Sequence, residues 1–258
     1  MKRNTAALCD QVWADRGLVT QDQLILANEK ASRRWQIIEE IISQSGQRFK
    51  HLSVIELGCG SGTYSALFAQ QGASVTVVDY SKTALKRTKE FYQHNQLRAK
   101  RVEADALHLP KALLGTFDVS LSVGPAEHFI GKKRRAIVQS HLAVLKPNGL
   151  AILIVPNAFN PPYQIYKFVA TKVNRWIFGE EFPFTHSELR QLAQSVGATV
   201  VAIKGDEFYS SIKFLLPANF LRRWFRVGLP TNAAKIRYEK PSIFDNSLGY
   251  NLIVALKK

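Results

Sequence analysis

The sequence feature that most constrains the fold is a glycine-rich stretch at residues 58–62, which follows a short apolar run. The apolar run covers residues 52–57 and predicts a buried β-strand, and residues 64–71 have an alanine-rich apolar pattern that suits a helix. A strand, a glycine loop and a helix in this order form the nucleotide-binding corner of an open α/β sheet. Because Gly58, Gly60 and Gly62 have no Cβ, their backbone lets a ligand approach closely.

The spacing of these glycines narrows the choice of ligand. A dinucleotide-binding loop has the form G-x-G-x-x-G, which would place its third glycine at position 63, where this chain has Thr63. The observed spacing, preceded by Glu56, resembles the first motif of class I S-adenosylmethionine-dependent methyltransferases, in particular small-molecule enzymes with a type-11-like methyltransferase domain. S-adenosylmethionine carries an ammonium group and no phosphate, and an acid such as Glu56 satisfies an ammonium directly or through water.

The ends of the later strands support this resemblance. Residues 73–80 predict a second strand whose acid, Asp79, lies 17 residues after Gly62, close to the spacing of a ribose-binding acid. Tyr80 offers a ring that can pack on adenine. In the resembled family, the acid after the third strand, here Asp105, accepts from the adenine amino group, and the next backbone amide binds a ring nitrogen. The predicted cofactor-binding residues are Glu56, Gly58, Cys59, Gly60, Gly62, Asp79, Tyr80, Asp105, Ala106 and Gly124.

The resemblance covers residues 50–160 well and implies a fold for the whole chain, which we expect to form one domain over residues 1–258. The expected fold is α/β and Rossmann-like: a doubly wound, mostly parallel sheet of seven strands in the order 3-2-1-4-5-7-6, with the last strand antiparallel. Its parts are a helical cap at 1–50, a cofactor-binding core at 51–156, and substrate-side lid insertions with closing strands at 157–258. The strands are predicted at 52–57, 73–80, 99–104, 117–124, 150–155, 199–203 and 251–256.

The first 50 residues predict two helices ahead of the sheet. Gly17 ends the first helix, and Thr20 begins the second, in which apolar residues recur at three- and four-residue steps as far as Ile42. We interpret these helices as a structural cover over the sheet edge or the cofactor cleft. The alternative is that they also form a wall of the substrate pocket.

The net charge of the chain indicates which classes of partner it can bind. The 258-residue chain has a formal net charge of +15, which fits an anionic substrate, RNA or an anionic membrane surface without selecting one of them. Residues 132–135 form a basic cluster at the start of a predicted helix, either as a solvated first turn or as a site for an anionic partner. Residues 219–227 are basic and amphipathic, which fits a packed lid helix or peripheral contact with an anionic membrane.

The cysteine count and the apolar runs predict the compartment. Cys9 and Cys59 are too few for a disulfide framework and indicate a reduced, intracellular environment. The sequence has neither a signal-like segment nor a run of about 18 apolar residues, so we expect a cytoplasmic protein. Membrane-peripheral attachment is the variant that residues 219–227 would support. No paired cysteine and histidine spacing suggests a metal, and we predict none.

The segment after the fifth strand contains Asn160-Pro-Pro-Tyr163, which matches a tetrapeptide that amino-methyltransferases use to hold a planar amide or amine. In those enzymes it follows the fourth strand, whereas here it follows the fifth, so we interpret the match as coincidental. We expect the loop to shape the substrate pocket. Residues 164–185 are rich in aromatic side chains and predict a small packed sub-core, with a lid over the substrate as the alternative. The predicted substrate contacts are Asn157, Tyr163, Tyr166 and His186.

The expected chemistry follows from the cofactor. Methyl transfer is an in-line displacement, so alignment of donor and acceptor in a dry pocket supplies most of the catalysis. A hydroxyl acceptor also needs a base, and His128, which follows the fourth strand, is the predicted candidate. The alternative is that Glu127 and His128 contact the cofactor or organise the loop, as this pair does in the resembled family.

The predicted function is methyl transfer to an oxygen or nitrogen of a small molecule, lipid-like or anionic. An RNA-directed methyltransferase fits the charge, but nucleic acid is the less favoured partner because the sequence has no appended RNA-binding module. The third alternative is a non-catalytic protein that binds S-adenosylmethionine. The segments that would contact the acceptor leave its identity open.

Overall fold

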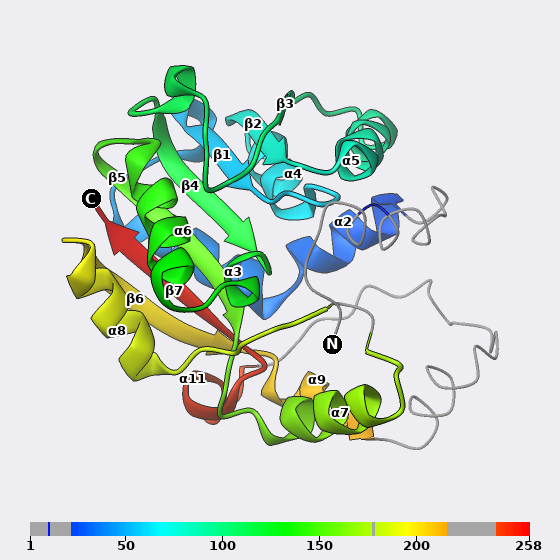
Figure 1. The fold of residues 1–258 in the computed structure, drawn as a ribbon. Coiled ribbons are helices and arrows are strands. Elements are labelled where there is room, and N and C mark those ends of the chain that lie inside the picture. Colours follow the sequence, from blue (N-terminus) through cyan, green and yellow to red (C-terminus); the bar gives the residue numbers. More distant parts are fainter. Residues whose placement is uncertain (1–9, 11–21, 177–178, 216–240) are drawn as a thin grey trace.

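The computed structural model describes residues 10, 22–176, 179–215 and 241–258 (Figure 1). The predicted first helix with its end at Gly17, the predicted helix start at Thr20, and the basic amphipathic segment 219–227 all lie outside the described residues. These predictions therefore stay untested.

A single seven-stranded sheet forms the centre of the described structure, with the strand order β3-β2-β1-β4-β5-β7-β6 (Figure 1). Strands β1 to β5 pair in parallel, and β7 lies antiparallel between β5 and β6. This arrangement confirms the predicted strand order and the antiparallel last strand. The strands are β1 (Ser53–Leu57), β2 (Ser74–Asp79), β3 (Lys100–Glu103), β4 (Phe117–Val123), β5 (Leu145–Pro156), β6 (Thr199–Asp206) and β7 (Asn251–Lys257).

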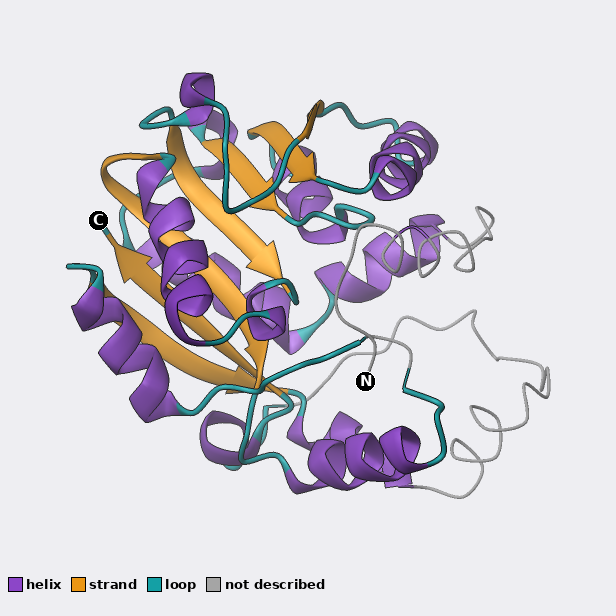
Figure 2. Ribbon diagram, viewed as in Figure 1, coloured by secondary structure: helices purple, strands orange, loops and turns teal. Residues whose placement is uncertain are grey.

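Helices cover both faces of the sheet (Figure 2). The α-helices are α2 (Asp22–Lys30), α3 (Arg33–Gln44), α4 (Thr63–Gln70), α5 (Lys82–His94), α6 (Gly131–Ala143), α7 (Pro161–Lys172), α8 (His186–Ser195), α9 (Phe208–Ile212) and α11 (Asp245–Leu248). The short 3-10 helices are η2 (Phe49–His51), η3 (Lys111–Leu113), η4 (Ala126–His128) and η5 (Lys213–Leu215). None of the helices in the described part of the chain combines the length and the apolar content that crossing a bilayer demands.

The fifth strand shows why two helical layers form. Successive side chains of a strand point to opposite faces, so a continuous apolar run must be covered on both sides. The core under α3 and α4 contains Leu150, Ile152 and Ile154, and the core under α6 and α8 contains Ala151, Leu153 and Val155. The sheet is therefore buried on both faces, and its functional groups lie at the strand ends.

The predicted continuous helix up to Ile42 is wrong, because the chain breaks between α2 and α3. The Ser32 side chain accepts from the backbone N–H of Trp35 at 3.1 Å and so begins a new helix. The break lets α3 turn onto the sheet, where the Trp35 ring meets Phe68 edge-on at 5.3 Å between ring centroids. The apolar residues keep their three- and four-residue spacing across the break, so periodicity alone does not reveal it.

The fifth strand is also longer than predicted, since it begins at Leu145 and not at residue 150. Residues 147–149 have the sequence Pro-Asn-Gly, which is a typical turn sequence. They lie within a register shift, in which Phe117 faces Leu145 and Val119 faces Leu150. Asn148 adopts a left-handed conformation with φ of 63°, so the turn chemistry is present but produces an irregularity inside the strand. Strand pairing on both sides of the irregularity outweighs the local turn signal.

Candidate functional site

The glycine loop joins β1 to α4 and is tied to the neighbouring strand by its own backbone. The N–H groups of Gly58 and Cys59 both donate to the carbonyl of Val78, at 2.8 and 3.0 Å. Gly58 has φ of 66°, and a Cβ on it would lie 2.9 Å from the Cβ of Pro125, in the turn after β4. The missing side chain therefore lets two loops at the carboxyl ends of β1 and β4 pack closely, beyond the ligand approach that the sequence predicted.

Asp79 stands at the end of β2, as predicted, and its carboxylate organises the loop. One oxygen accepts from the N–H of Gly60 at 3.0 Å, and the other accepts from the N–H of Ser81 at 2.9 Å. Burial raises the pKa of this carboxyl, while the backbone donors act in the opposite direction. Tyr80 follows directly and keeps 38 % of its surface exposed. Its packing on adenine stays a prediction, and an accessible ring beside the loop is compatible with it.

Glu56 lies on β1 and is buried below the loop. Its carboxylate accepts from the hydroxyl of Ser65 and from the Ser65 N–H at 3.3 Å, at the start of α4. Burial raises the pKa of Glu56 to about 7, and no Lys or Arg nitrogen of the described residues lies within 4.0 Å of it. A buried acid without a cation is what an incoming ammonium group requires, so the residue fits its predicted role.

Asp105 and Ala106 follow β3, as predicted, but the Asp105 carboxylate already has local partners. One oxygen accepts from the N–H of Leu107 at 2.9 Å, and the other lies 2.9 Å from Nδ1 of His108. Sequence reasoning did not identify this histidine, although its position three residues after the acid was visible. The adenine contact of Asp105 stays a prediction.

Gly124 ends β4 and directs the chain into η4. It has φ of 93°, and its N–H donates to the carbonyl of Ile154 at 3.1 Å. A Cβ here would lie 3.3 Å from an oxygen of the Glu127 carboxylate. The glycine thus places Glu127 and His128 at the carboxyl end of β4, the edge of an α/β sheet where ligands bind.

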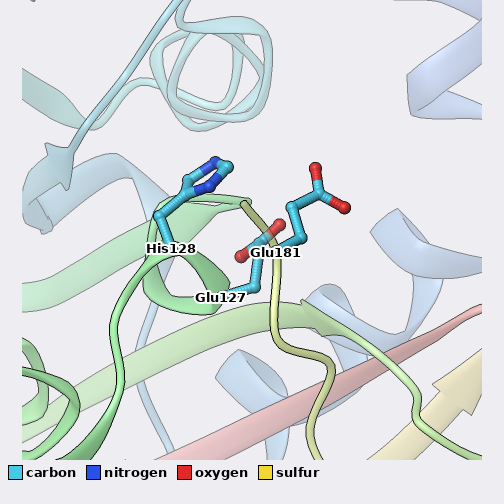
Figure 3. Close-up of side chains that lie close together, drawn as sticks. All are labelled: Glu127, His128 and Glu181. Atoms are coloured by element: carbon cyan, nitrogen blue, oxygen red, sulfur yellow. The ribbon is translucent and has the colours of Figure 1, made fainter. Parts of the chain in front are cut away.

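The side chains of Glu127 and His128 meet Glu181, which comes from the segment between α7 and α8 (Figure 3). One ligand atom from each of the three side chains lies within 4.8 Å of the other two. The backbone completes the junction, because the Phe182 N–H donates to the Glu127 carbonyl at 2.8 Å. His128 places Nδ1 2.8 Å from the carbonyl of Glu180, so Nδ1 carries the proton and Nε2 carries the lone pair.

Burial sets the protonation of this cluster. It raises the pKa of Glu127 well above its ordinary value, with the nearby Glu181 acting in the same direction. It also raises the pKa of Glu181 to about 7 and lowers the pKa of His128. One oxygen of Glu127, Oε2, is buried without a hydrogen-bond partner. The cluster thus combines a buried carboxyl, a half-buried carboxyl and a half-buried, neutral imidazole.

Aromatic rings surround the acidic cluster on the α7 side. The Tyr163 hydroxyl donates to Glu181 at 2.9 Å, and its ring lies edge-on to Trp176 and Tyr250. Lys167 places its ammonium over the Tyr163 and Trp176 rings, 5.7 Å from each centroid, and donates to the Glu181 carbonyl. Trp176 belongs to the predicted aromatic sub-core of residues 164–185, whereas Tyr163 and Tyr250 lie outside that range and Phe168 within it is exposed. Sequence reasoning missed Glu181 and Lys167, because only the fold brings residues this far apart in the chain to His128.

Arg134 belongs to the predicted basic cluster but is buried and not solvated. Its guanidinium donates to the Phe129 carbonyl at 2.7 Å, to Glu188 at 2.5 Å and to the Phe182 carbonyl. It also lies 3.8 Å from the centroid of the Phe184 ring. The solvated-turn interpretation is therefore wrong for Arg134, which clamps the segment of Glu181 onto α6. Its three basic neighbours in the cluster are exposed.

The tetrapeptide at Asn160 is a helix cap. The Asn160 side chain is fully buried, accepts from the Tyr163 N–H at 2.7 Å, and donates to Ser211 and to the Leu248 carbonyl. Its amide thus binds the protein itself, in agreement with a coincidental match to the amine-binding motif. Prolines at the next two positions suit the first turn of α7.

The remaining predicted substrate contacts are spread over the α7 side. Asn157 is fully buried and donates to the Ser247 and Gly249 carbonyls, so its amide supports the loop. The Tyr166 ring lies against Trp176 and within the same aromatic group as Tyr163. His186 begins α8, which packs on β6 and β7. Of these residues, Tyr163 contacts the acidic cluster directly.

The residues present fit S-adenosylmethionine. The loop glycines have positive φ angles, Asp79 lies at the strand end beside them, and no Lys or Arg nitrogen in the described part of the chain lies within 4.0 Å of the buried Glu56. These features suit the ribose hydroxyls and the ammonium group of the cofactor. The acidic cluster of Glu127, His128 and Glu181 lies at the end of the adjacent strand β4.

Comparisons with known proteins agree with this arrangement. A family model described as a methyltransferase domain matches residues 54–149. Ubiquinone biosynthesis O-methyltransferase of Rickettsia akari is 23% identical over 66% of this chain and 67% of its own length. The Coxiella burnetii protein of the same name is 28% identical over 68% of this chain and 74% of its own length.

A solved structure extends the likeness to the whole fold. The 1,6-didemethyltoxoflavin-N1-methyltransferase of Burkholderia thailandensis, solved with bound S-adenosylhomocysteine, has a TM-score of 0.60 and 16% identity. The match covers 98% of this chain and 88% of that one. Taken with the glycine loop, the acids at the strand ends and the strand order, these likenesses show a methyltransferase domain at residues 54–149 and, for the chain, the fold of class I S-adenosylmethionine-dependent methyltransferases.

Proposed function

We propose that this methyltransferase acts on a hydroxyl group of a small phenol-like acceptor, bound beside the cluster of Glu127, His128 and Glu181. The observation that carries the proposal is the junction of a buried carboxyl, a half-buried carboxyl and a neutral imidazole at the end of β4. Groups that accept a proton are required for a hydroxyl acceptor more than for a neutral amine. The printed name of the curated relatives, an O-methyltransferase of ubiquinone biosynthesis, supports the same acceptor atom.

The reaction requires little covalent work from the protein. S-adenosylmethionine supplies a methyl carbon on a positively charged sulfur, which is the leaving group. The acceptor oxygen forms a bond to that carbon while the carbon–sulfur bond breaks, and the hydroxyl proton passes to a basic group. The products are a methyl ether, S-adenosylhomocysteine and one proton. The chain's main tasks are therefore to align the two reactants, exclude water and receive the proton.

His128 has the properties of the predicted base. Its Nδ1 is oriented by the Glu180 carbonyl, and burial lowers its pKa, so the ring is neutral at physiological pH with its lone pair on Nε2. Trp176, which is partly exposed and packs on the buried Tyr163 ring, offers an apolar surface for a flat acceptor. The aromatic side chains would position the acceptor, and His128 would take the proton from its hydroxyl group.

The first test is calorimetric titration with S-adenosylhomocysteine, with NAD as the control ligand. We expect binding of the former alone, at micromolar affinity on the order of small-molecule cofactor sites. Phenolic acceptors and their amine analogues are then compared using a labelled methyl donor. Transfer to amines alone, with phenols inert, would contradict the hydroxyl assignment, and binding of NAD instead would contradict the cofactor.

The net charge of +15 keeps RNA as a second candidate acceptor. Lys132, Lys133 and Arg135 are exposed on α6 and contribute to this charge. Salt-dependent retention on RNA, together with labelled methyl transfer to RNA, would favour it. Cytoplasmic location and peripheral membrane attachment through residues 219–227 remain predictions. A vesicle-sedimentation assay with anionic and neutral lipids tests the attachment.

A further inference from the structure

We propose that Glu127, His128 and Glu181 bind a divalent metal ion. The inference opposes the prediction of no metal, which depended on sequence spacing alone. Glu127 and His128 are adjacent on η4, whereas Glu181 reaches them from the segment after α7 (Figure 3). A motif search for closely spaced ligands does not find such a set, because its third member is 53 residues beyond His128 (181 − 128).

The geometry of the three side chains suits one ion. A ligand atom of each lies within 4.8 Å of the other two. An ion about 2.1 Å from each ligand holds ligand atoms roughly 3–4 Å apart, so small side-chain rotations close the site. The His128 ring is already oriented by the hydrogen bond between Nδ1 and the Glu180 carbonyl. Metal-binding histidines have this second interaction as a rule, since it fixes Nε2 as the ligand nitrogen.

The charges around the cluster point to a missing cation. Two buried acids elsewhere in the described structure have an arginine, since Asp22 pairs with Arg87 and Asp206 pairs with Arg34 at 2.6 Å, and the buried Glu56 does not. Among the described residues, neither Glu127 nor Glu181 has a Lys or Arg nitrogen within 4.0 Å of its carboxylate. In addition, the Oε2 atom of Glu127 is buried without a hydrogen-bond partner. An unpaired buried carboxylate is costly unless a ligand completes it.

Lys167 is the nearest alternative source of positive charge. Its ammonium donates to the backbone carbonyl of Glu181 and lies over the Tyr163 and Trp176 rings. It is therefore held beside the cluster and outside ion-pair distance of both carboxylates. Two carboxylates and one ammonium leave one negative charge, which a divalent ion more than compensates.

The donor set narrows the metal. Two carboxylate oxygens and one imidazole nitrogen form a mixed, fairly hard set that suits Mn²⁺ or Zn²⁺ better than Cu⁺ or an iron–sulfur cluster. Three protein ligands also leave positions open, as in catalytic metal sites. The Tyr163 hydroxyl, which donates to Glu181 at 2.9 Å, would orient that ligand from behind.

Binding of the ion does not depend on the proposed function. A catalytic role for the ion rests on that function and would deepen it. An ion at this site could bind the acceptor oxygen and lower the pKa of its hydroxyl, so that the proton is lost to water. His128 would then act as a ligand and not as the base. This changes the expected behaviour of the enzyme, because methyl transfer would depend on the ion and on both carboxylates.

The test uses full-length protein stripped with EDTA, dialysed and saturated with S-adenosylhomocysteine. Mn²⁺ is titrated alone, and its binding is followed by loss of the EPR signal of free Mn²⁺; Zn²⁺ is titrated by calorimetry. We expect one ion per chain, and affinity weaker by about tenfold or more in Glu181→Gln and in Glu127→Gln. The control is Glu103→Gln, which removes an exposed carboxyl at the end of β3, outside the cluster, and should bind the ion like the parent protein.

Thermal unfolding with and without Mn²⁺ provides a second readout, because the ion should raise the Tm of the parent protein but not that of the Glu127→Gln/Glu181→Gln double variant. Neither carboxyl has an ion-pair partner among the described residues, and an amide at position 181 still accepts from the Tyr163 hydroxyl, so the metal-free double variant should stay folded. Equal Mn²⁺ binding by the parent and the double variant, or no binding by either, would overturn the metal site. If S-adenosylhomocysteine still binds in that case, the cofactor assignment stands, whereas loss of its binding to the parent would count against the proposed function itself.

Discussion

The two halves of the proposed site are built in different ways. The cofactor half comprises the glycine loop with Glu56 and Asp79, and the acceptor half that we propose comprises Glu127, His128 and Glu181 with the aromatic rings beside them. The cofactor half collects residues from successive strand ends, and its polar groups largely hold the glycine loop, as Asp79 does through Gly60 and Ser81. The acceptor half depends on contacts between distant segments, such as Glu127 with Glu181. The first half is therefore fixed by local geometry of the sheet, and the second by how the segment between α7 and α8 is clamped.

The clamp at Arg134 should produce the largest effect on the acceptor half. Replacing Arg134 with Met removes three hydrogen bonds and the stacking on Phe184, so the free energy of unfolding should fall by about 3–4 kcal/mol. Denaturant unfolding measures this loss. The exposed neighbour provides the control, since Arg135→Met should cost about 1 kcal/mol or less.

The same variant also tests whether the two halves are independent. If they are, the affinity of Arg134→Met for S-adenosylhomocysteine should stay near that of the parent under conditions where the variant is folded. Affinity that falls in step with stability would show that the clamp also supports the cofactor half.

The pH dependence of the free energy of unfolding tests the environment of Glu56 in the cofactor half. Its folded pKa is about 7, against 4.5 for an unperturbed carboxyl, so the folded protein keeps this proton while the unfolded chain loses it. The free energy of unfolding should therefore decline as pH rises from 4.5 to 7, by up to about 3 kcal/mol from this residue. Glu56→Gln should lack that part of the decline when unfolding is measured at pH 5 and pH 8. Parallel pH curves for variant and parent would contradict the burial of an unpaired acid here.

Asp79→Ala should weaken binding of S-adenosylhomocysteine by about 100-fold, because the variant loses charge-assisted acceptors for ribose and the two hydrogen bonds that hold the loop. Calorimetric titration gives the affinity. The matched control is Glu103→Gln, because Glu103 is an exposed acid at the end of β3. This variant should bind S-adenosylhomocysteine like the parent protein. Unchanged affinity in Asp79→Ala would remove this residue from the cofactor site.

Asn160→Ala is expected to have the smallest effect and distinguishes a cap from an acceptor contact. The loss of the cap and of the hydrogen bonds to Ser211 and Leu248 should lower the free energy of unfolding by about 2 kcal/mol. Asn160→Asp keeps the capping acceptor and should recover part of this stability. A variant of parental stability that has lost methyl transfer would instead favour the amine-binding interpretation of the tetrapeptide.

Much of the cofactor half was predictable from the sequence. The glycine spacing and the position of Asp79 at the end of the second strand have local signatures, because turn glycines and strand periodicity are read from neighbouring residues. The strand order was predicted through the resemblance to the methyltransferase family. Where local signals failed, longer-range pairing or packing dominated. Apolar spacing concealed the cap at Ser32, and strand pairing carried β5 through the Pro-Asn-Gly sequence.

The sequence by itself determined the strands and the position of the glycine loop, since these follow from patterns within short stretches, and the family resemblance implied the order of the strands in the sheet. Only the tertiary structure decided the acceptor half. It buried Arg134 in a run of basic residues, and it brought Glu181 to Glu127 and His128. The physical reason is that a side chain's burial and charge partners depend on which distant segment packs against it, and no periodicity in the chain records that choice.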